Sequence, residues 1–167
     1  ENLPKQGPYI ICVNHTSYYD AFIIAASVGF KYELDLYFFG FRGYFQVPVI
    51  ENTVKAARVI PVDTAKDLIP AMQAAAYVLK QDKSLCIFPE GERSTDGELK
   101  KFKNGVGILS KELNIPLIPA IIKGAYHAWP RSKILPSIHP IHVVFGRPYN
   151  PNILLKKGYH LDTEDDY

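Results

Sequence analysis

The sequence predicts an α/β fold in which a largely parallel or mixed central sheet carries helices on both faces. Short apolar runs rich in β-branched residues alternate with amphipathic stretches for most of the chain. This alternation of strands and helices is typical of a sheet covered by helices. The length of 167 residues fits one domain and is enough to bury a substantial core.

The first expected elements lie within the first 50 residues. The run YIICV, residues 9–13, predicts a strand buried on both faces. A helix follows over residues 18–28, with Ser17 placed to cap its first turn. A second extended segment is expected near residues 34–39. The aromatic stretch 41–50, interrupted by glycine and proline, gives no clear assignment.

The middle of the chain continues the pattern. Residues 58–62, RVIPV, predict a strand or edge strand, because Pro61 cannot donate a hydrogen bond to a neighbouring strand. Residues 65–80 are the clearest predicted helix, and residues 85–88, LCIF, predict a further strand. The apolar residues of that helix recur at intervals of three and four: Leu68, Ile69, Met72, Ala75, Ala76 and Leu79.

The remaining elements are a helix over residues 104–113 and strands over residues 117–122 and 141–145. Pro119 interrupts the first of these strands. We expect residues 1–150 to form the domain and residues 151–167 to form a C-terminal tail with a solvated acidic end. The inward side chains expected for the helix are Val106, Ile108, Leu109 and Leu113.

Composition limits the function. A net charge of +2 does not call for nucleic acid. Cys12 and Cys86 lie in apolar runs, which favours buried free thiols over redox or metal roles. The longest apolar stretch, residues 21–30, is about half of the ~20 residues that span a bilayer. The chain can nevertheless be an excerpt of a longer, membrane-tethered protein.

The segment NHTSYYD, Asn14 to Asp20, follows the first predicted strand, and sites of open α/β sheets lie at such strand ends. His15 and Asp20 can meet if the histidine lies in the loop and the aspartate in the first helical turn. A neutral histidine can then take a proton from an alcohol, while the carboxylate holds its other ring nitrogen. The alternative is structural, because Ser17 and Asp20 also have a spacing close to that of a capping box. No second histidine or carboxylate cluster stands at metal-ligand spacing.

The segment FPEGERS, Phe88 to Ser94, also follows a predicted strand. Gly91 allows a ligand to approach the backbone closely, and Arg93 offers a planar fork suited to phosphate. Glu90 is placed to orient Arg93 or to accept a substrate hydroxyl. Further basic residues form a possible collar around an anionic head group, although lysines beside a turn are commonly just solvated: Lys55, Arg58, Lys66, Lys100, Lys101 and Lys103.

With both motifs in view, the chain resembles the PlsC-type lysophospholipid and glycerol-phosphate acyltransferases. The family's N-H-x4-D block is present as NHTSYYD, and its F-P-E-G-T-R-S block as FPEGERS. The other blocks match ARVIPVDT at 57–64, FKNG at 102–105, IPLIPAIIKG at 115–124 and VVFGRP at 143–148. The resemblance extends from about residue 9 to residue 148.

This resemblance implies a PlsC-like fold and transfer of an acyl group from acyl-CoA or acyl-carrier protein to the hydroxyl of a lysophospholipid. His15 would be the general base and Asp20 its orienting partner. The residues expected to bind substrate are Glu90, Gly91, Arg93, Arg58, Lys66 and Pro119. No cofactor or metal is expected beyond the acyl donor. We add one expectation of our own, that backbone N–H groups near Gly91 or the helix starts stabilise the oxyanion.

Two departures from the family pattern bear on the acceptor. Glu92 replaces the usual threonine in FPEGERS, and Thr64 stands where the second block often has arginine. An added carboxylate beside Arg93 would weaken phosphate binding or select an acceptor that carries an amine. FPEGERS-type variants resemble acyltransferase segments fused to acyl-CoA or acyl-carrier-protein ligases.

A lysolipid acceptor implies contact with a membrane, and we expect its cytoplasmic face, with peripheral attachment or anchoring by segments outside this chain. The aromatic stretch 37–45 suits a membrane interface, an acyl tunnel wall or ordinary core packing. Two other functions remain open: a non-catalytic lipid-binding module of the same fold, and an acyl-thioester hydrolase.

Overall fold

The computed structural model describes residues 2–4, 7–29, 35–41, 58–62 and 68–156. One six-stranded sheet has the strand order β3-β2-β4-β1-β5-β6. The first five strands in this order run parallel, and β6 is antiparallel to β5. The strands are β1 (Ile10–Val13), β2 (Leu36–Phe41), β3 (Val59–Val62), β4 (Ser84–Ile87), β5 (Leu117–Lys123) and β6 (His142–Phe145).

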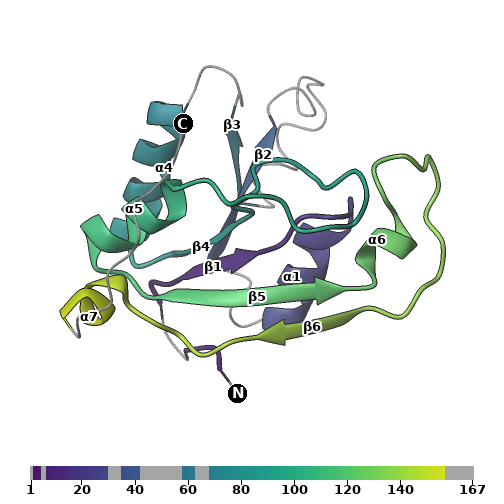
Figure 1. The fold of residues 1–167 in the computed structure, drawn as a ribbon. Coiled ribbons are helices and arrows are strands. Elements are labelled where there is room, and N and C mark those ends of the chain that lie inside the picture. The colour runs from purple at the N-terminus through teal and green to yellow at the C-terminus, as the bar shows by residue number, and fades with distance from the viewer. Residues whose placement is uncertain (1, 5–6, 30–34, 42–57, 63–67, 157–167) are drawn as a thin grey trace.

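Helices cover both faces of this sheet (Figure 1). α4 and α5 pack on one face, and α1 packs on the other. The α/β fold with a mixed, largely parallel sheet is thereby confirmed. The described helices are α1 (Asp20–Val28), α4 (Leu68–Lys80), α5 (Gly105–Leu113), α6 (Ala125–Ala128) and α7 (Pro151–Lys156).

The central strand β1 contributes to both halves of the core. Ile10 packs in the cluster that includes α4 and α5, whereas Ile11 and Val13 pack with α1. All three are fully buried, because successive side chains of a strand point to opposite faces. This explains why the strand reads as a continuous apolar run.

One predicted inward side chain is wrong. Ile108 is 53% exposed, because the buried stripe of α5 runs through Val106, Leu109 and Leu113 at intervals of three and four, and Ile108 lies off it. Ile69 is 71% exposed in the first turn of α4, where the apolar face extends past the packed part of the helix.

The structure also refines the predictions for the two cysteines, the aromatic stretch 37–45 and the number of helices. Cys86 is buried and Cys12 only partly so, and both are free thiols. Of the aromatic stretch 37–45, Phe38 is in the core, Tyr37 and Phe39 pack against it, and residues 42–45 lie outside the described residues. Two short helices, α6 and α7, were not predicted.

The C-terminal part of the chain packs on the domain as far as it is described. Tyr149 pairs with Leu117 of β5, and α7 lies against α5. The first six residues of the predicted tail are therefore helical, and the rest of the tail lies outside the described residues. In the described part of the chain, no helix has the length and apolar character needed to cross a bilayer.

Candidate active site

The two sequence motifs lie side by side at the carboxyl edge of the sheet. β1 and β4 are adjacent and parallel, with Cys12 level with Ile87. Asn14 follows the end of β1 directly, and Phe88 follows the end of β4. Segments 75 residues apart are thus brought together by strand pairing alone.

His15 and Asp20 are in direct contact, with 2.8 Å between Nδ1 and Oδ2. As the spacing predicted, His15 lies in the loop and Asp20 is the first residue of α1. Asp20 is fully buried, whereas the His15 side chain is 22% exposed and its ring stacks on Phe88 at 4.0 Å. Because Nδ1 faces the carboxylate, Nε2 is the ring nitrogen available to a substrate, and no described residue hydrogen-bonds to it.

The same carboxylate oxygen also orders the loop. The backbone N–H groups of Thr16 and Ser17 donate to Asp20 Oδ2 at 2.6 and 2.8 Å. The capping-like role and the histidine contact, posed as alternatives by the sequence, are therefore both present. Ser17 is not the predicted cap: the N-cap position is Tyr19, and Ser17 Oγ donates to the Trp129 carbonyl at 2.8 Å.

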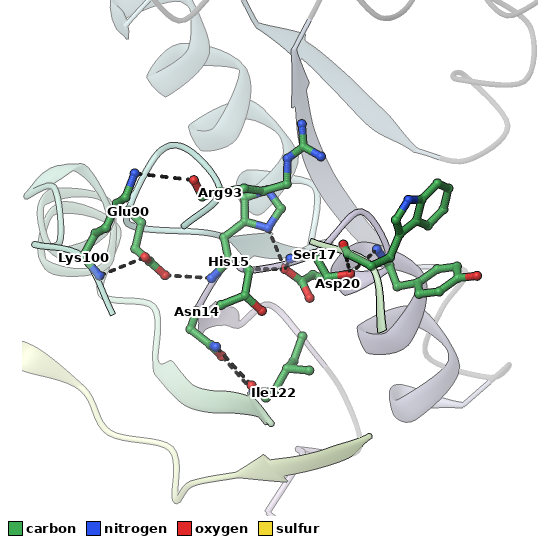
Figure 2. A network of polar contacts seen from close by, with 11 residues as sticks. Asn14, His15, Ser17, Asp20, Glu90, Arg93, Lys100 and Ile122 are labelled. Atoms are coloured by element: carbon green, nitrogen blue, oxygen red, sulfur yellow. Dashed lines mark hydrogen bonds and ion pairs between the residues drawn. The ribbon is translucent and has the colours of Figure 1, made fainter. Parts of the chain in front are cut away.

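Glu90 joins the two motifs, as Figure 2 shows to one side of His15. It is 3% exposed, and its Oε1 accepts the backbone N–H of His15 at 2.7 Å. Its Oε2 accepts the backbone N–H of Lys100 at 3.0 Å. The backbone N–H of Ser94 also donates to the His15 carbonyl at 2.7 Å. Glu90 was expected to contact Arg93 or substrate, but its oxygens here hold the backbone of the histidine loop.

Asn14 fixes the other side of that loop (Figure 2). Its Nδ2 donates to the Ile122 carbonyl at 3.1 Å, and its Oδ1 accepts the Ile122 N–H at 2.8 Å. The side chain thus continues the pairing of β1 with β5 one residue beyond the end of β1. The backbone N–H and C=O groups of His15 are thus both hydrogen-bonded, and the preceding residue, Asn14, is hydrogen-bonded through its side chain.

Arg93 lies over an aromatic ring, with its guanidinium carbon 3.6 Å from the centre of the Tyr18 ring. Glu92, the carboxylate that departs from the family pattern, pairs with Lys100 at 3.0 Å and with Arg131 at 3.6 Å. The hydrogen bond and charge of Lys100 lower the pKa of Glu92, so this carboxylate is ionised at neutral pH. Its charge is thus partly compensated by cations other than Arg93.

Gly91 and Lys103 meet at the FPEGERS turn. Gly91 has φ of +77°, and a Cβ placed there would lie 2.6 Å from Lys103 Nζ. The lysine ammonium therefore lies directly over the turn, where the positive φ favours glycine. Lys103 belongs to the site, while Lys55 lies outside the described residues.

At two of the places where we expected oxyanion donors, the backbone N–H groups have partners within the chain. The Gly91 N–H donates to the Phe88 carbonyl at 3.0 Å. At the start of α1, the N–H groups of the loop are already bonded to Asp20, to Ser17 or to Trp129: those of Thr16, Ser17, Tyr18, Tyr19 and Asp20.

Arg58 is not brought to the histidine. It precedes β3, which lies three strands from β1, roughly 14 Å across the sheet. The register places Val59 level with Phe38 and hence with Cys86, behind the carboxyl edge. The position of Arg58 in the sequence does not show that the strand after it lies at the edge of the sheet and not at its centre.

Pro119 also lies behind the site. It is level with Cys12 in the pairing of β1 with β5, three residues before Ile122. Its carbonyl accepts the Gly146 N–H at 2.7 Å, so its position serves the join of β5 to the last strand. Lys66 lies outside the described residues.

Two hollows adjoin the described elements without including His15. One of about 550 Å³ lies between α1 and β6, and one of about 420 Å³ lies beside Asn14 and Thr16, against the end of β5. Among the described residues, no group of three or more histidine, cysteine or acidic side chains is placed to hold a metal ion.

The comparison with known families decides the family. Residues 1–123, which include both motifs, match the model of the family described as Acyltransferase. This chain belongs to the acyltransferase family. The resemblance read from NHTSYYD and FPEGERS is thereby confirmed.

Relatives of this acyltransferase chain carry one consistent name. It is 29% identical over 140 residues to the chloroplastic 1-acyl-sn-glycerol-3-phosphate acyltransferase BAT2 of Brassica napus, covering 82% of this chain and 38% of that protein. It is 29% identical over 175 aligned positions to the 1-acyl-sn-glycerol-3-phosphate acyltransferase of Limnanthes douglasii, covering all of this chain and 57% of that protein. The chain thus spans about half the length of these relatives, or less.

The fold of the acyltransferase chain also has a solved counterpart. The crystal structure of the 1-acyl-sn-glycerophosphate acyltransferase PlsC from Thermotoga maritima superposes with a TM-score of 0.77 and 24% sequence identity. The match covers 98% of this chain and 62% of that one. The PlsC-like fold is therefore confirmed.

Sequence reasoning missed one residue that the structure places in the wall of this site. Trp129 packs against the rings of Tyr18 and Tyr19, with centroids 5.0 and 4.9 Å apart, and its carbonyl accepts from Ser17. It is the only tryptophan of the chain. Trp129 belongs to no recognisable motif and follows a short predicted strand. Its position in the sequence therefore does not indicate a contact with a motif 110 residues earlier.

Proposed function

We propose that this chain is the catalytic part of a 1-acyl-sn-glycerol-3-phosphate acyltransferase in which His15 deprotonates the acceptor hydroxyl. The observation that supports this most directly is the 2.8 Å contact between His15 Nδ1 and buried Asp20, at the sheet edge shared with FPEGERS. The names of its relatives supply the acceptor class.

The reaction follows from the orientation of the imidazole. His15 Nε2 takes the proton of the acceptor hydroxyl as its oxygen attacks the carbonyl carbon of the acyl thioester. The carbon–sulfur bond then breaks, and the imidazolium returns its proton to the departing thiolate. Asp20 holds the tautomer with Nδ1 protonated and stabilises the imidazolium between the two transfers. The thioester itself is the activated donor, so no further cofactor is needed.

The phosphate of the acceptor is assigned to Arg93 and Lys103. Arg93 is held over Tyr18, and the Lys103 ammonium lies over Gly91 in the same motif. A guanidinium suits the planar, bidentate recognition of phosphate, and an ammonium adds a point charge. Glu90 positions His15 through its backbone instead of binding phosphate.

Two substitutions test the proposal. His15→Ala removes the base and is expected to lower kcat for acyl transfer by about a thousandfold. Asp20→Asn is expected to lower kcat strongly as well, because the neutral amide no longer stabilises the imidazolium. His142→Ala, an exposed histidine on β6, is the matched control and is expected to retain full activity. Full activity of His15→Ala would refute the assignment.

The measurement is mass spectrometry of the products formed from 1-acylglycerol 3-phosphate, with acyl-CoA and acyl-carrier protein offered in parallel. Formation of the diacyl product with either donor supports the proposal and identifies the donor. Release of free fatty acid without acceptor, at an equal rate, would instead identify a thioester hydrolase. Binding of lipid with no release of thiol from either donor would identify a non-catalytic module.

A further inference from the structure

A long loop between α6 and β6 projects beyond the carboxyl edge of the sheet and is seen in green at the right of Figure 1. All ten residues from 131 to 140 are exposed. The loop lies beyond residues 1–123, which match the family model. We call residues 131–140 the α6–β6 loop.

This loop exposes apolar side chains to an unusual degree. Among the large hydrophobic residues of the described part, the three most exposed are Ile138 at 106%, Ile134 at 91% and Leu135 at 76%. They lie within five positions of one another. Single exposed apolar residues are ordinary, but a cluster at a loop tip marks an interaction surface.

The part of the chain that carries these side chains has charged residues of one sign, although Glu92 of the FPEGERS turn lies 3.6 Å from Arg131. No aspartate or glutamate occurs between Glu112 and Asp162. Arg131 and Lys133 lie within the loop itself, and His139 follows them. Apolar side chains flanked by cations suit the interface of an anionic bilayer, where the apolar groups enter the acyl boundary and the cations meet head groups.

The base of the loop is pinned, so its tip projects from a fixed support. The Trp129 indole N–H donates to the Lys133 carbonyl at 3.1 Å. The Ser137 backbone N–H donates to the Ala128 carbonyl at 2.8 Å, and its hydroxyl donates to the His127 carbonyl at 2.9 Å. A short segment ordered before binding loses little conformational freedom when it inserts.

The same support contacts the candidate active site. The Trp129 carbonyl accepts the Ser17 hydroxyl at 2.8 Å, and Ser17 donates its N–H to Asp20. Arg131 pairs with Glu92 of the FPEGERS turn at 3.6 Å. A membrane bound by this loop would therefore lie close to His15 and the FPEGERS turn, where the lysolipid acceptor has to bind.

We propose that the α6–β6 loop is the membrane-contact element of this chain, inserting Ile134, Leu135 and Ile138 into an anionic bilayer with Arg131 and Lys133 at the head groups. The choice of a lipid surface rests on the proposed function. The binding itself is measured without acyl transfer, so the two fail separately.

The test is co-sedimentation of the chain with vesicles of phosphatidylcholine alone or of equal parts phosphatidylcholine and phosphatidic acid. The triple variant Ile134→Ser, Leu135→Ser, Ile138→Ser is expected to lose about tenfold or more of its partition onto the anionic vesicles. Lys133→Gln is expected to lose about fivefold on the anionic vesicles only. The matched control, Ile69→Ser with Tyr77→Ser and Ile153→Ser, replaces three other exposed apolar residues, on α4 and α7, and is expected to bind like the unmodified chain.

A second measurement locates the contact. Because Trp129 is the only tryptophan, quenching of its fluorescence by brominated lipids reports on the base of this loop alone. Quenching is expected for the unmodified chain and the control variant, and not for the triple variant. All three proteins should unfold at the same urea concentration, which shows without any measurement of acyl transfer that the triple variant is folded.

Two results would overturn the proposal. The first is binding of the triple variant to anionic vesicles at the level of the control. The second is self-association of the unmodified chain, seen by sedimentation velocity and abolished in the triple variant while vesicle binding is unchanged, because the loop would then contact a second copy of this chain.

Discussion

At the scale of single residues, the acidic side chains of the site accept hydrogen bonds from the loop backbone in addition to any role in the reaction. Asp20 Oδ2 accepts from the Thr16 and Ser17 N–H groups and faces His15 Nδ1. Glu90 does the same for the N–H groups of His15 and Lys100. Buried carboxylates of this kind fix a loop because each lost partner leaves a buried polar group unsatisfied.

Glu90→Gln tests this positioning role. A carboxamide has one acceptor oxygen where the carboxylate has two, so one of the N–H groups of His15 or Lys100 loses its partner. We expect the free energy of unfolding to fall by about 1–3 kcal/mol, measured by urea denaturation. We also expect kcat to fall while KM for the acceptor changes little, because the histidine moves but Arg93 and Lys103 remain.

Glu98→Gln is the matched control for that change. Glu98 is an exposed carboxylate eight residues further along the chain, and the same substitution there is expected to change stability by less than about 0.5 kcal/mol. Equal stability of the two variants would contradict the role given to Glu90.

The sequence predicted part of this residue-scale geometry. The His15–Asp20 contact followed from a five-residue spacing across a strand-to-helix turn, since local spacing restricts which side chains can meet. The partners of Glu90 could not be predicted in this way, because they depend on which strands are neighbours. Asn14 bonding to Ile122, 108 residues away, is another case of the same kind.

At the scale of elements, the sheet order brings the motifs together. β1 lies between β4 and β5, and all three are parallel, so the segments that follow them reach one edge. Alternating strand and helix patterns predicted such a sheet. They gave no strand order, and for that reason they did not show that Arg58 precedes the edge strand β3, three strands from β1, or that Pro119 lies level with Cys12, before the end of β1.

The helices are stabilised by side chains that pack against the sheet, and Leu79→Ala measures the contribution of one of them. Leu79 of α4 is 1% exposed and packs with Leu85 and Leu117. Its truncation leaves a cavity and is expected to lower the free energy of unfolding by about 2–5 kcal/mol. Ile69→Ala, on the exposed first turn of the same helix, is expected to change it by less than about 0.5 kcal/mol.

Urea denaturation of both helix variants is the measurement. The comparison also separates two residues that recur in one apolar pattern along the sequence, because Leu79 is 1% exposed and Ile69 is 71% exposed. If Ile69→Ala costs as much as Leu79→Ala, the side chain of Ile69 is covered in solution and the exposure described for it is wrong.

At the scale of the whole molecule, the two thiols in the sheet couple stability to alkaline pH. Burial raises the pKa of the Cys12 thiol from 9.0 to about 11, and burial raises that of Cys86 as well. The folded chain therefore keeps these thiols protonated at pH values where the unfolded chain releases their protons. The stabilisation is complete below about pH 9 and is lost as the pH rises towards 11.

Cys12→Ala isolates this effect from the lysines and tyrosines that titrate in the same range. Between pH 9.0 and about 11, the free energy of unfolding of the unmodified chain should fall more steeply than that of the variant, by about 1 kcal/mol per pH unit. Below pH 8 the two curves should run parallel, because a neutral thiol in both states binds no differential proton. Urea denaturation at intervals of half a pH unit makes the comparison. Parallel curves through the whole alkaline range would mean that the Cys12 thiol titrates in the folded sheet as it does in the unfolded chain, and that β1 is more open to water beside the site than its packing indicates.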